Sequence, residues 1–232
     1  RDITMTIRSG TLTLLVGGSG SGKSTLLRTM NGLVPKFFEG TMRGRVEVDG
    51  TDLAGVELHD VGRTSAMIFQ NPRTQFFTSI VRTELAFGLE NYGVDPSEIR
   101  DAMTRAVGQT GIAHLLDRRL DTLSGGELQR VACACALVTD VDLLLFDEPT
   151  SNLSAEGIDD FRHLVAQLKA SGKTLVIAEH RLHLFRGMVD VVHRISDGRV
   201  AETMTGDDLF SLTDMERTER GLRALDVLPV DI

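Results

Sequence analysis

The sequence predicts an α/β fold whose central sheet is mainly parallel. Residues 143–146 and 174–178 are short, continuously apolar segments, which are typical of parallel strands covered by helices on both faces. Between them, apolar residues recur with the period of a helix. Residues 11–16 form another apolar segment, which ends in a glycine-rich loop and is followed by a helix beginning at Lys23 or Ser24. Strand, loop and helix in this order are the start of an α/β unit.

The remaining segments extend this pattern. Residues 45–50 alternate between apolar and polar side chains, which predicts an antiparallel strand with one face in water. Residues 66–69 form a short buried strand, and residues 78–136 are mostly helical with loop interruptions. Near the end of the chain, Asp197-Gly198 separates two strand-like segments within residues 191–202, which is a strong hairpin signal.

The composition argues against a nucleic-acid-binding or membrane-spanning protein. The 232 residues include 33 acidic and 25 basic side chains, a net charge of −8, whereas sequence-independent binding to nucleic acid needs basic residues. Aromatic residues make up 5%, without Trp, which argues weakly against a stacking platform. No segment approaches the ~18 consecutive apolar residues of a membrane span, and no export signal is present. We expect a soluble chain that meets a membrane only through a partner.

The cysteines and histidines indicate no metal or disulfide chemistry. Cys133 and Cys135 lie two residues apart on a predicted helix, so they point in different directions and cannot form a comfortable disulfide. We expect small buried thiols in a reducing compartment. Among the histidines only His180 and His183 lie close in sequence, which is a weak basis for a metal site.

The glycine-rich loop predicts a phosphate site. Residues 17–24 match G-x-x-x-x-G-K-[ST], a pattern met by chance in about 1% of chains of this length. The alternative is a glycine-rich turn that happens to contain a lysine. Glycines let successive N–H groups surround an anion, and the following helix adds the positive end of its dipole. Lys23 can then reach the β and γ phosphates of a nucleotide, and Ser24 offers a hydroxyl to Mg²⁺.

Two acids follow the buried strand at residues 143–146. Asp147 and Glu148 stand at its carboxyl end, the edge of an open parallel sheet where ligands bind. Asp147 is suited to hold Mg²⁺, and Glu148 to deprotonate an attacking water. In isolation the pair has a simpler interpretation, as two solvated acids after a strand.

A second glycine pair precedes a long predicted helix. Ser124 is a good N-cap, and Glu127 three residues later completes a capping box. Gly125 and Gly126 also expose backbone N–H groups at a helix start, which is a second anion site in one chain. Two phosphate loops in one chain suggest that two copies share nucleotides across an interface.

These motifs resemble those of the nucleotide-binding subunits of ATP-binding-cassette (ABC) transporters. The family order is phosphate loop, glutamine loop, signature loop, Asp-Glu strand, D-loop and switch histidine. Here these motifs are residues 17–25, Gln70, residues 123–127, Asp147 with Glu148, residues 151–154, and His180. The resemblance covers roughly residues 1–205. It implies a P-loop NTPase (RecA-like) core with a mainly parallel sheet, a small antiparallel β part and an inserted α-helical subdomain.

The resemblance also implies a domain organisation. Residues 1–232 would be a single ABC ATPase domain. Its nucleotide-binding core would comprise residues 1–73 and 139–205, its helical subdomain with the signature loop residues 74–138, and its C-terminal tail residues 206–232. We expect the family's amino-terminal strand and adenine-stacking aromatic residue to be missing, because they precede the first strand of this chain. No adenine contact is therefore assigned.

ATP and Mg²⁺ are the cofactors that the resemblance implies. The catalytic residues would be Glu148, which activates water, His180, which contacts the γ phosphate, and Gln70, which reports the nucleotide state to a membrane partner. Mg²⁺ would be held by Ser24, Gln70 and Asp147. The nucleotide would be bound by two sets of residues. The phosphate loop provides Gly17, Gly18, Ser19, Gly20, Ser21, Gly22, Lys23, Ser24 and Thr25, and the signature loop of the opposite subunit provides Ser124, Gly125 and Gly126.

Shorter segments resemble the energy-coupling-factor group of ABC transporters, which drives uptake of vitamins and transition-metal ions. They are residues 31–35, 69–76 and 178–182. This implies a second ABC ATPase subunit, identical or different. It also implies a transmembrane coupling subunit that touches residues 75–83, and a substrate-binding membrane subunit that chooses the substrate. The chain would lie peripherally on the cytoplasmic face of the membrane, without a nucleic-acid partner.

Two alternative functions and one departure accompany this interpretation. A soluble ABC-type ATPase acting on nucleic acid or ribosomes is disfavoured by the acidic balance and the lack of a basic insertion. A non-hydrolysing regulatory cassette is disfavoured because Lys23, Glu148 and His180 are all present. The usual D-loop aspartate is Ser154 here, which by the resemblance implies altered communication between the two ATP sites.

Overall fold

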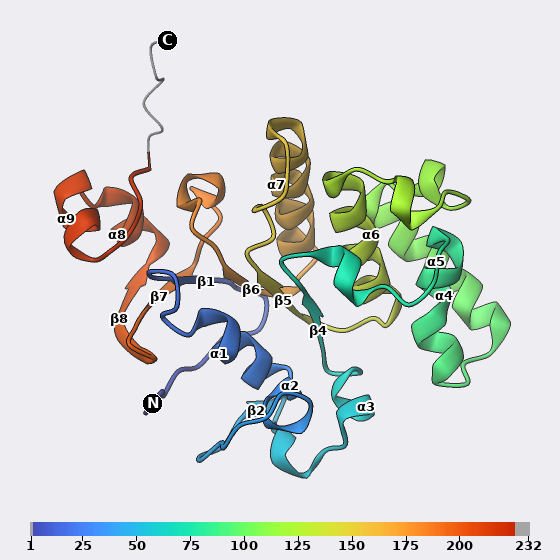
Figure 1. The fold of residues 1–232 in the computed structure, drawn as a ribbon, viewed down its shortest axis with the longest axis horizontal. Coiled ribbons are helices and arrows are strands. Elements are labelled where there is room, and N and C mark those ends of the chain that lie inside the picture. Colours follow the sequence, from blue (N-terminus) through green and yellow to red (C-terminus); the bar gives the residue numbers. More distant parts are fainter. Residues whose placement is uncertain (1, 226–232) are drawn as a thin grey trace.

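The computed structural model describes residues 2–225 and contains a six-stranded sheet with helices on both faces (Figure 1). The strands lie in the order β4-β5-β6-β1-β7-β8. Neighbours are parallel from β4 to β7, and β8 pairs antiparallel with β7. The strand bounds are β1 Leu12–Val16, β4 Ser65–Ile68, β5 Leu143–Asp147, β6 Thr174–Ala178, β7 Val191–Ser196 and β8 Arg199–Thr205. The prediction of a mainly parallel sheet with a C-terminal hairpin is therefore confirmed.

Alternate residues of the central strands enter two different cores. Leu15 on β1 packs with Leu27 and Met30 of helix α1 (Lys23–Met30) on one face of the sheet. Leu14, one residue earlier, joins the larger core on the opposite face, formed with α6 (Gly125–Val138) and α7 (Ala155–Ala170). On that face, the ring of Phe161 on α7 packs edge-on against the ring of Phe146 on β5, with 5.7 Å between the ring centroids. Burial on both faces explains why these strands are continuously apolar.

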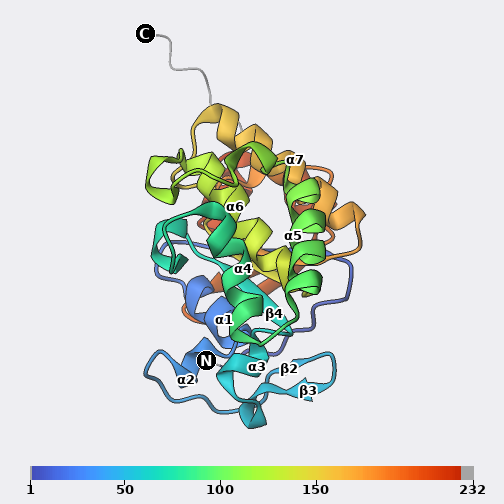
Figure 2. The same ribbon diagram turned by 90° about the vertical axis from the view of Figure 1, so that its right-hand side faces the viewer.

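Helices α4 (Val81–Asn91), α5 (Pro96–Thr110) and α6 lie together at one end of the molecule (Figure 2). Asp95 caps α5 through the N–H of Ser97, and Pro96 occupies the first helical turn, where a proline costs no hydrogen bond. The buried apolar side chains of these helices belong to the same large core that covers one face of the sheet. The division into a core and a helical subdomain at residues 73/74 and 138/139 stays a prediction.

The antiparallel strand predicted at residues 45–50 is shorter than expected. Only Glu47–Val48 (β2) pairs, with Thr51–Asp52 (β3), in a small second sheet. Asp49 and Gly50 turn the chain with φ values of 48° and 76°, as a two-residue hairpin loop requires. The remaining short elements lie in the connections between the longer helices and strands. They are α2 Leu33–Lys36, α3 Leu58–Val61 and the 3₁₀ turns Leu53–Gly55, Pro72–Gln75, Ala113–Leu115, Leu120–Thr122 and Leu182–Phe185.

The C-terminal segment forms two short capped helices. Thr205 caps α8 (Gly206–Ser211), and Thr213 caps α9 (Asp214–Glu219), each in a capping box. Leu209 and Leu222 anchor the segment in the main core. The predicted tail of residues 206–232 is thus helical over residues 206–211 and 214–219, and its last seven residues lie outside the described part of the chain. Within residues 2–225, no helix has the length and apolar character needed to cross a bilayer.

Candidate functional site

The phosphate loop connects β1 to α1 and is closed tightly by its glycines. Gly17 has a φ of 145°, and a Cβ there would lie 2.1 Å from the carbonyl oxygen of Ile195. Gly22, in a left-handed conformation at φ 104°, is the N-cap of α1. Only glycine fits both requirements. Gly18, Ser19 and Gly20 form the exposed crest of the loop, Ser21 is buried, and Thr25 is exposed on α1.

Lys23 fills the space inside this loop. Its ammonium donates to the carbonyl oxygens of Gly17 at 2.9 Å and Gly18 at 3.0 Å, and the residue is 4% exposed. Burial lowers the pKa of Lys23, while the negative charges of Glu148 and Asp147 oppose that shift. The loop therefore holds a desolvated cation beside two acids, where an incoming phosphate can replace the two carbonyl oxygens.

Ser24 and Asp147 meet from two different elements. Ser24 Oγ, on the first turn of α1, donates to Oδ1 of Asp147, the last residue of β5, at 2.7 Å. Burial raises the pKa of Asp147, and the hydrogen bond from Ser24 partly offsets that rise. A hydroxyl and a carboxylate side by side are oxygen ligands of the kind that Mg²⁺ takes beside phosphates and water. The two residues therefore fit a magnesium site.

Glu148 accepts hydrogen bonds from both of the other predicted catalytic residues. Gln70 Nε2 donates to Oε2 of Glu148 at 3.2 Å, and His180 Nε2 lies 3.2 Å from Oε1. Gln70, Glu148 and His180 follow β4, β5 and β6, which are neighbours in the sheet. Glu148 itself has a φ of 45°, an uncommon conformation for a residue with a side chain. The structure thus brings these three side chains together at the carboxyl edge of the sheet.

Glu179 also belongs to this site, although the sequence had predicted no role for it. It is 3% exposed, and its Oε2 accepts from the N–H of Thr150 at 3.2 Å and from its hydroxyl at 2.6 Å. Its Oε1 accepts from the N–H groups of His180 at 2.7 Å and Arg181 at 3.1 Å. Glu179 therefore fixes the segment after β5 to the segment that carries His180. An acid directly after a continuously apolar strand was the available signal.

The signature loop has the predicted cap. Ser124 accepts from the N–H of Glu127 at 3.3 Å, and Glu127 accepts from the N–H of Ser124 at 2.7 Å. That second bond is the main cause of the lowered pKa of Glu127. A Cβ on Gly125 would lie 2.6 Å from the carbonyl oxygen of Asn152, and a Cβ on Gly126 3.4 Å from Cα of Gly157. The glycines therefore allow this loop to pack closely on the D-loop and α7.

The signature loop and the phosphate loop lie apart in the same chain. No hydrogen bond in the described part of the chain joins Ser124, Gly125 or Gly126 to residues 17–25. Figure 1 shows α6 beside α4 and α5, on the far side of β4 from α1. The structure thus assembles the phosphate loop, Ser24, Asp147, Glu148, Gln70 and His180 in one place, and leaves residues 124–126 outside it.

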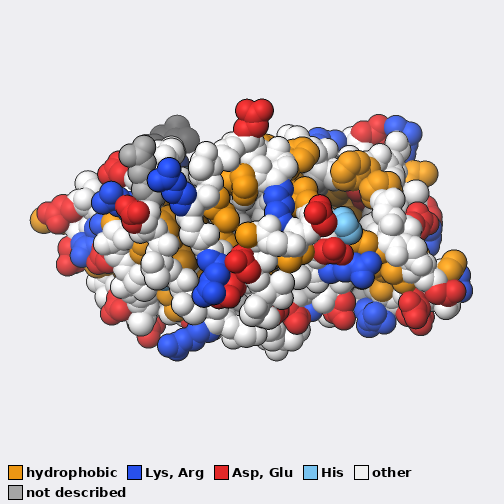
Figure 3. Space-filling model, turned by 90° about the horizontal axis from the view of Figure 1, so that it is seen from below, with side chains coloured by type: hydrophobic (Ala, Val, Ile, Leu, Met, Phe, Trp, Pro, Cys, Tyr) orange, Lys and Arg blue, Asp and Glu red, His pale blue; other side chains and the backbone are white. Residues whose placement is uncertain are grey.

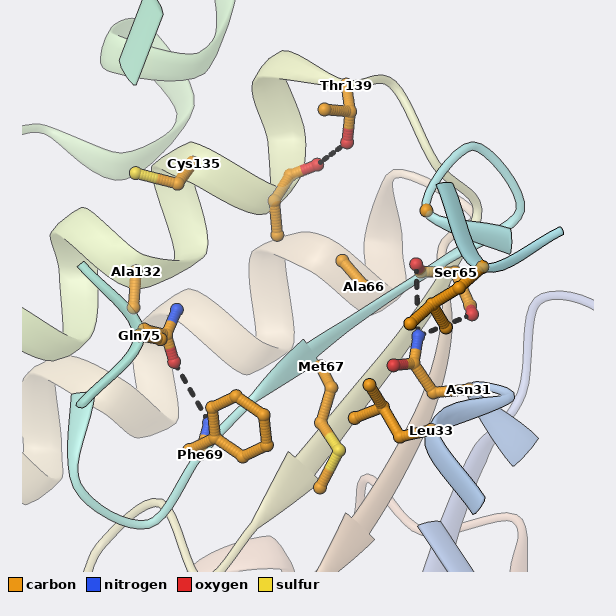
Figure 4. A pocket seen from close by; sticks show the side chains of 13 residues that line it. Asn31, Leu33, Ser65, Ala66, Met67, Phe69, Gln75, Ala132, Cys135 and Thr139 are labelled. Atoms are coloured by element: carbon orange, nitrogen blue, oxygen red, sulfur yellow. Dashed lines mark hydrogen bonds between the residues drawn. The ribbon is translucent and has the colours of Figure 1, made fainter. Parts of the chain in front are cut away.

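A groove of about 350 Å³ lies next to the glutamine loop, between β4 and α6 (Figure 4). Met67 and Phe69 line it from the β4 side, and Ala132 and Cys135 from α6. Gln75 lines it too and accepts from the N–H of Phe69 at 3.1 Å, as the dashed line shows. The groove is therefore mostly apolar and is joined to the loop that carries Gln70.

A family model described as ABC transporter matches residues 1–151 of the chain. The chain belongs to the ABC transporter family. Among relatives of this ABC chain, an ABC transporter ATP-binding protein of Treponema denticola is 37% identical over 96% of the chain. One of Methanosarcina acetivorans is 40% identical over 86% of the chain. The chain covers 45% and 33% of these two relatives, less than half their length.

Solved structures give the same result for the ABC fold. CbiO1 from Clostridium perfringens, described as part of the ABC transporter complex cbiONQ, has a TM-score of 0.81 and 30% identity. That comparison covers 93% of this chain and 85% of CbiO1. A dimeric cassette, MJ0796, bound to ADP and Pi, has a TM-score of 0.74 over 88% of each chain; its 22% identity supports the fold alone. The predicted P-loop NTPase fold is confirmed, and the chain is an ABC-type ATPase domain.

The cysteines of this ABC domain are free, as expected. Cys133 is fully buried, and burial raises its pKa to about 12, so the neutral thiol is favoured at physiological pH. Burial also raises the pKa of Cys135.

The roles assigned to Gln70, Glu148 and His180 stay predictions.

Proposed function

We propose that this chain is the ATP-hydrolysing subunit of a membrane transporter, of the energy-coupling-factor kind that takes up a vitamin or a metal ion. The observation that carries the proposal is the junction at the sheet edge. There, Lys23 in its loop, the Ser24–Asp147 pair and the Gln70–Glu148–His180 cluster lie near one another. These are the groups that phosphoryl transfer needs: an anion cradle, oxygen ligands for Mg²⁺ and a base for water.

ATP would bind by displacing the internal contacts of the phosphate loop. The ammonium of Lys23 exchanges the carbonyl oxygens of Gly17 and Gly18 for β- and γ-phosphate oxygens. The N–H groups of the loop and the start of α1 add partial positive charge to the same site. Ser24 and Asp147, with Gln70, would hold Mg²⁺, which neutralises charge on the phosphates when it is bound. The strength of the site comes from groups already fixed before the nucleotide arrives.

Glu148 would act as the base that accepts a proton from the attacking water. In the structure, Gln70 and His180 contact its two carboxylate oxygens. A water between Glu148 and the γ phosphate would take over one of these hydrogen bonds. Gln70 would then orient this water and His180 would contact the γ phosphate. Gln70, Glu148 and His180 are held in these positions because each follows one of three neighbouring strands.

Two such domains would close on two ATP molecules. Residues 124–126 lie apart from the phosphate loop of their own chain, and a helix start with exposed N–H groups is an anion site. We infer that this loop completes the ATP site of a second cassette, identical or different. The dimeric arrangement described for MJ0796 supports this inference at the level of the fold.

The membrane partner would contact the groove beside the glutamine loop. Phe77 is 78% exposed and Ile80 41% exposed, both within the segment that follows Gln75. Exposed apolar side chains that gather in one segment are typical of an interaction site. The description of CbiO1 as part of the cbiONQ complex supports a transmembrane coupling subunit and a substrate-binding membrane subunit as partners. The chain would then lie peripherally on the cytoplasmic face of the membrane.

Purification of the full-length protein from detergent-solubilised membranes tests this proposal. We expect membrane subunits to co-purify and the complex to release phosphate from ATP in the presence of Mg²⁺. Lys23→Ala should abolish that release. Co-purification with nucleic acid or ribosomes instead would favour the soluble cassette. On the face seen in Figure 3, Lys and Arg side chains are interspersed with Asp and Glu, which does not favour nucleic acid there.

A further inference from the structure

The glutamine loop is tied to the signature loop by an arginine side chain. Arg73, three residues after Gln70, donates from Nη2 to the carbonyl oxygen of Leu123 at 3.1 Å. Leu123 is 3% exposed and directly precedes the N-cap Ser124. The backbone of Arg73 is itself fixed, because its N–H donates to the side chain of Asn71 at 3.2 Å. This bond therefore joins two segments that are separated by 50 residues.

A second link joins the same two loops through the D-loop. Asn152 Nδ2 donates to the carbonyl oxygen of Gln70 at 3.1 Å. The carbonyl oxygen of Asn152 lies so close to Gly125 that a Cβ there would be 2.6 Å away. Each of the glutamine loop, the D-loop and the signature loop thus contacts the other two. A shift of Gln70 cannot leave the signature loop where it was unless one of these contacts breaks.

The neighbouring charges leave the Arg73 guanidinium available for this contact. Arg119 forms the ion pair with Asp121, at 2.8 Å. The positive charge of Arg73 adds only a small further lowering of the Asp121 pKa. A planar guanidinium keeps several donors in a fixed geometry, so it holds a carbonyl oxygen more firmly than a flexible ammonium does.

We propose that Arg73 is a positioning residue that makes the signature loop of this chain follow its glutamine loop. Gln70 contacts Glu148 in the chain's own ATP site, whereas residues 124–126 would serve the ATP of the second cassette. Arg73 therefore transmits the state of one site to the loop that completes the other. The inference rests on the proposed function, in which two cassettes share their ATP sites.

Mixed dimers of two differently tagged full-length copies test this role. In both arrangements one copy carries Glu148→Gln, so that only one site hydrolyses ATP. In the first, Arg73→Ala is placed in the other copy, whose own Glu148 is intact. The working site then uses an unaltered signature loop. In the second, Arg73→Ala is placed in the copy with Glu148→Gln, so the working site uses the altered signature loop.

We expect the second arrangement to lose roughly tenfold in kcat, the order expected from one charge-assisted hydrogen bond. The first should match the dimer that carries Glu148→Gln alone. Arg73→Lys should restore part of the rate, because an ammonium can still donate to the carbonyl oxygen. The matched control is Arg105→Ala, which removes an exposed arginine of α5 and should leave both rates unchanged.

Equal losses in both arrangements would mean that Arg73 only supports the fold, and a loss in the first alone would mean that it acts on its own site. Either result overturns the proposal. Failure of the unaltered dimer to hydrolyse ATP would count against the proposed function and not against the role of Arg73.

Discussion

The carboxylate of Glu148 lies 3.2 Å from Nε2 of His180, although the two residues follow different strands of the sheet. We expect Glu148→Gln to bind ATP and to slow hydrolysis about 100-fold or more, because an amide cannot accept the proton of water. The dimer should then stay closed on its nucleotides. Phosphate release, together with nucleotide retained on gel filtration, measures both effects. Hydrolysis at an undiminished rate would show that Glu148 is not the base. Glu98→Gln, at an exposed position of α5, is the control.

Gly17→Ala should destabilise the protein even without nucleotide. The new Cβ would lie 2.1 Å from the carbonyl oxygen of Ile195, and the φ of 145° is unfavourable for alanine. We expect a loss of about 2–4 kcal/mol in the free energy of unfolding. Gly18→Ala is the matched control for stability, because nothing lies within 4 Å of its Cβ. Equal urea midpoints for the two variants would contradict the close approach of the phosphate loop to β7.

Glu179→Gln should affect stability and hydrolysis together. The carboxylate accepts four hydrogen bonds, from both polar groups of Thr150 and from the N–H groups of His180 and Arg181. An amide would turn donors toward some of these donors, so we expect a loss of about 2–4 kcal/mol. Urea unfolding measures the first effect.

Phosphate release below the unfolding transition measures the second effect, the displacement of His180. Glu90→Gln, on the exposed surface of α4, should change neither quantity. A Glu179→Gln variant with unaltered unfolding and hydrolysis would show that this carboxylate does not hold the two segments together.

The sequence was sufficient for the strands and motifs that carry a local signal. Continuous apolar segments located β5 and β6 correctly, and the lysine of the phosphate loop marks the first residue of α1. The capping box at Ser124 was also predictable, because its two residues lie three apart on one turn. Each of these features depends on residues close together in the chain.

The contacts that complete the site were not predictable in this way. Glu179 and Thr150 are separated by 29 residues, and Arg73 and Leu123 by 50. Their pairing depends on which strands are neighbours in the sheet, which no local pattern encodes. The strand expected over residues 45–50 was too long because alternation marks a wet face and not the length of the partner strand.

Ser154 replaces the usual D-loop aspartate, yet it keeps one task that an aspartate could perform. It is the N-cap of α7, and its hydroxyl accepts from the N–H of Gly157 at 3.2 Å. We expect Ser154→Ala to lower the free energy of unfolding by about 1 kcal/mol, because one N–H at the start of the helix loses its partner. Ser154→Asp should stay within about 0.5 kcal/mol of the unaltered protein, since a carboxylate caps equally well. Urea unfolding of the three proteins at neutral pH measures the difference. Equal stability of the alanine variant and the unaltered chain would show that the hydroxyl is not needed as a cap.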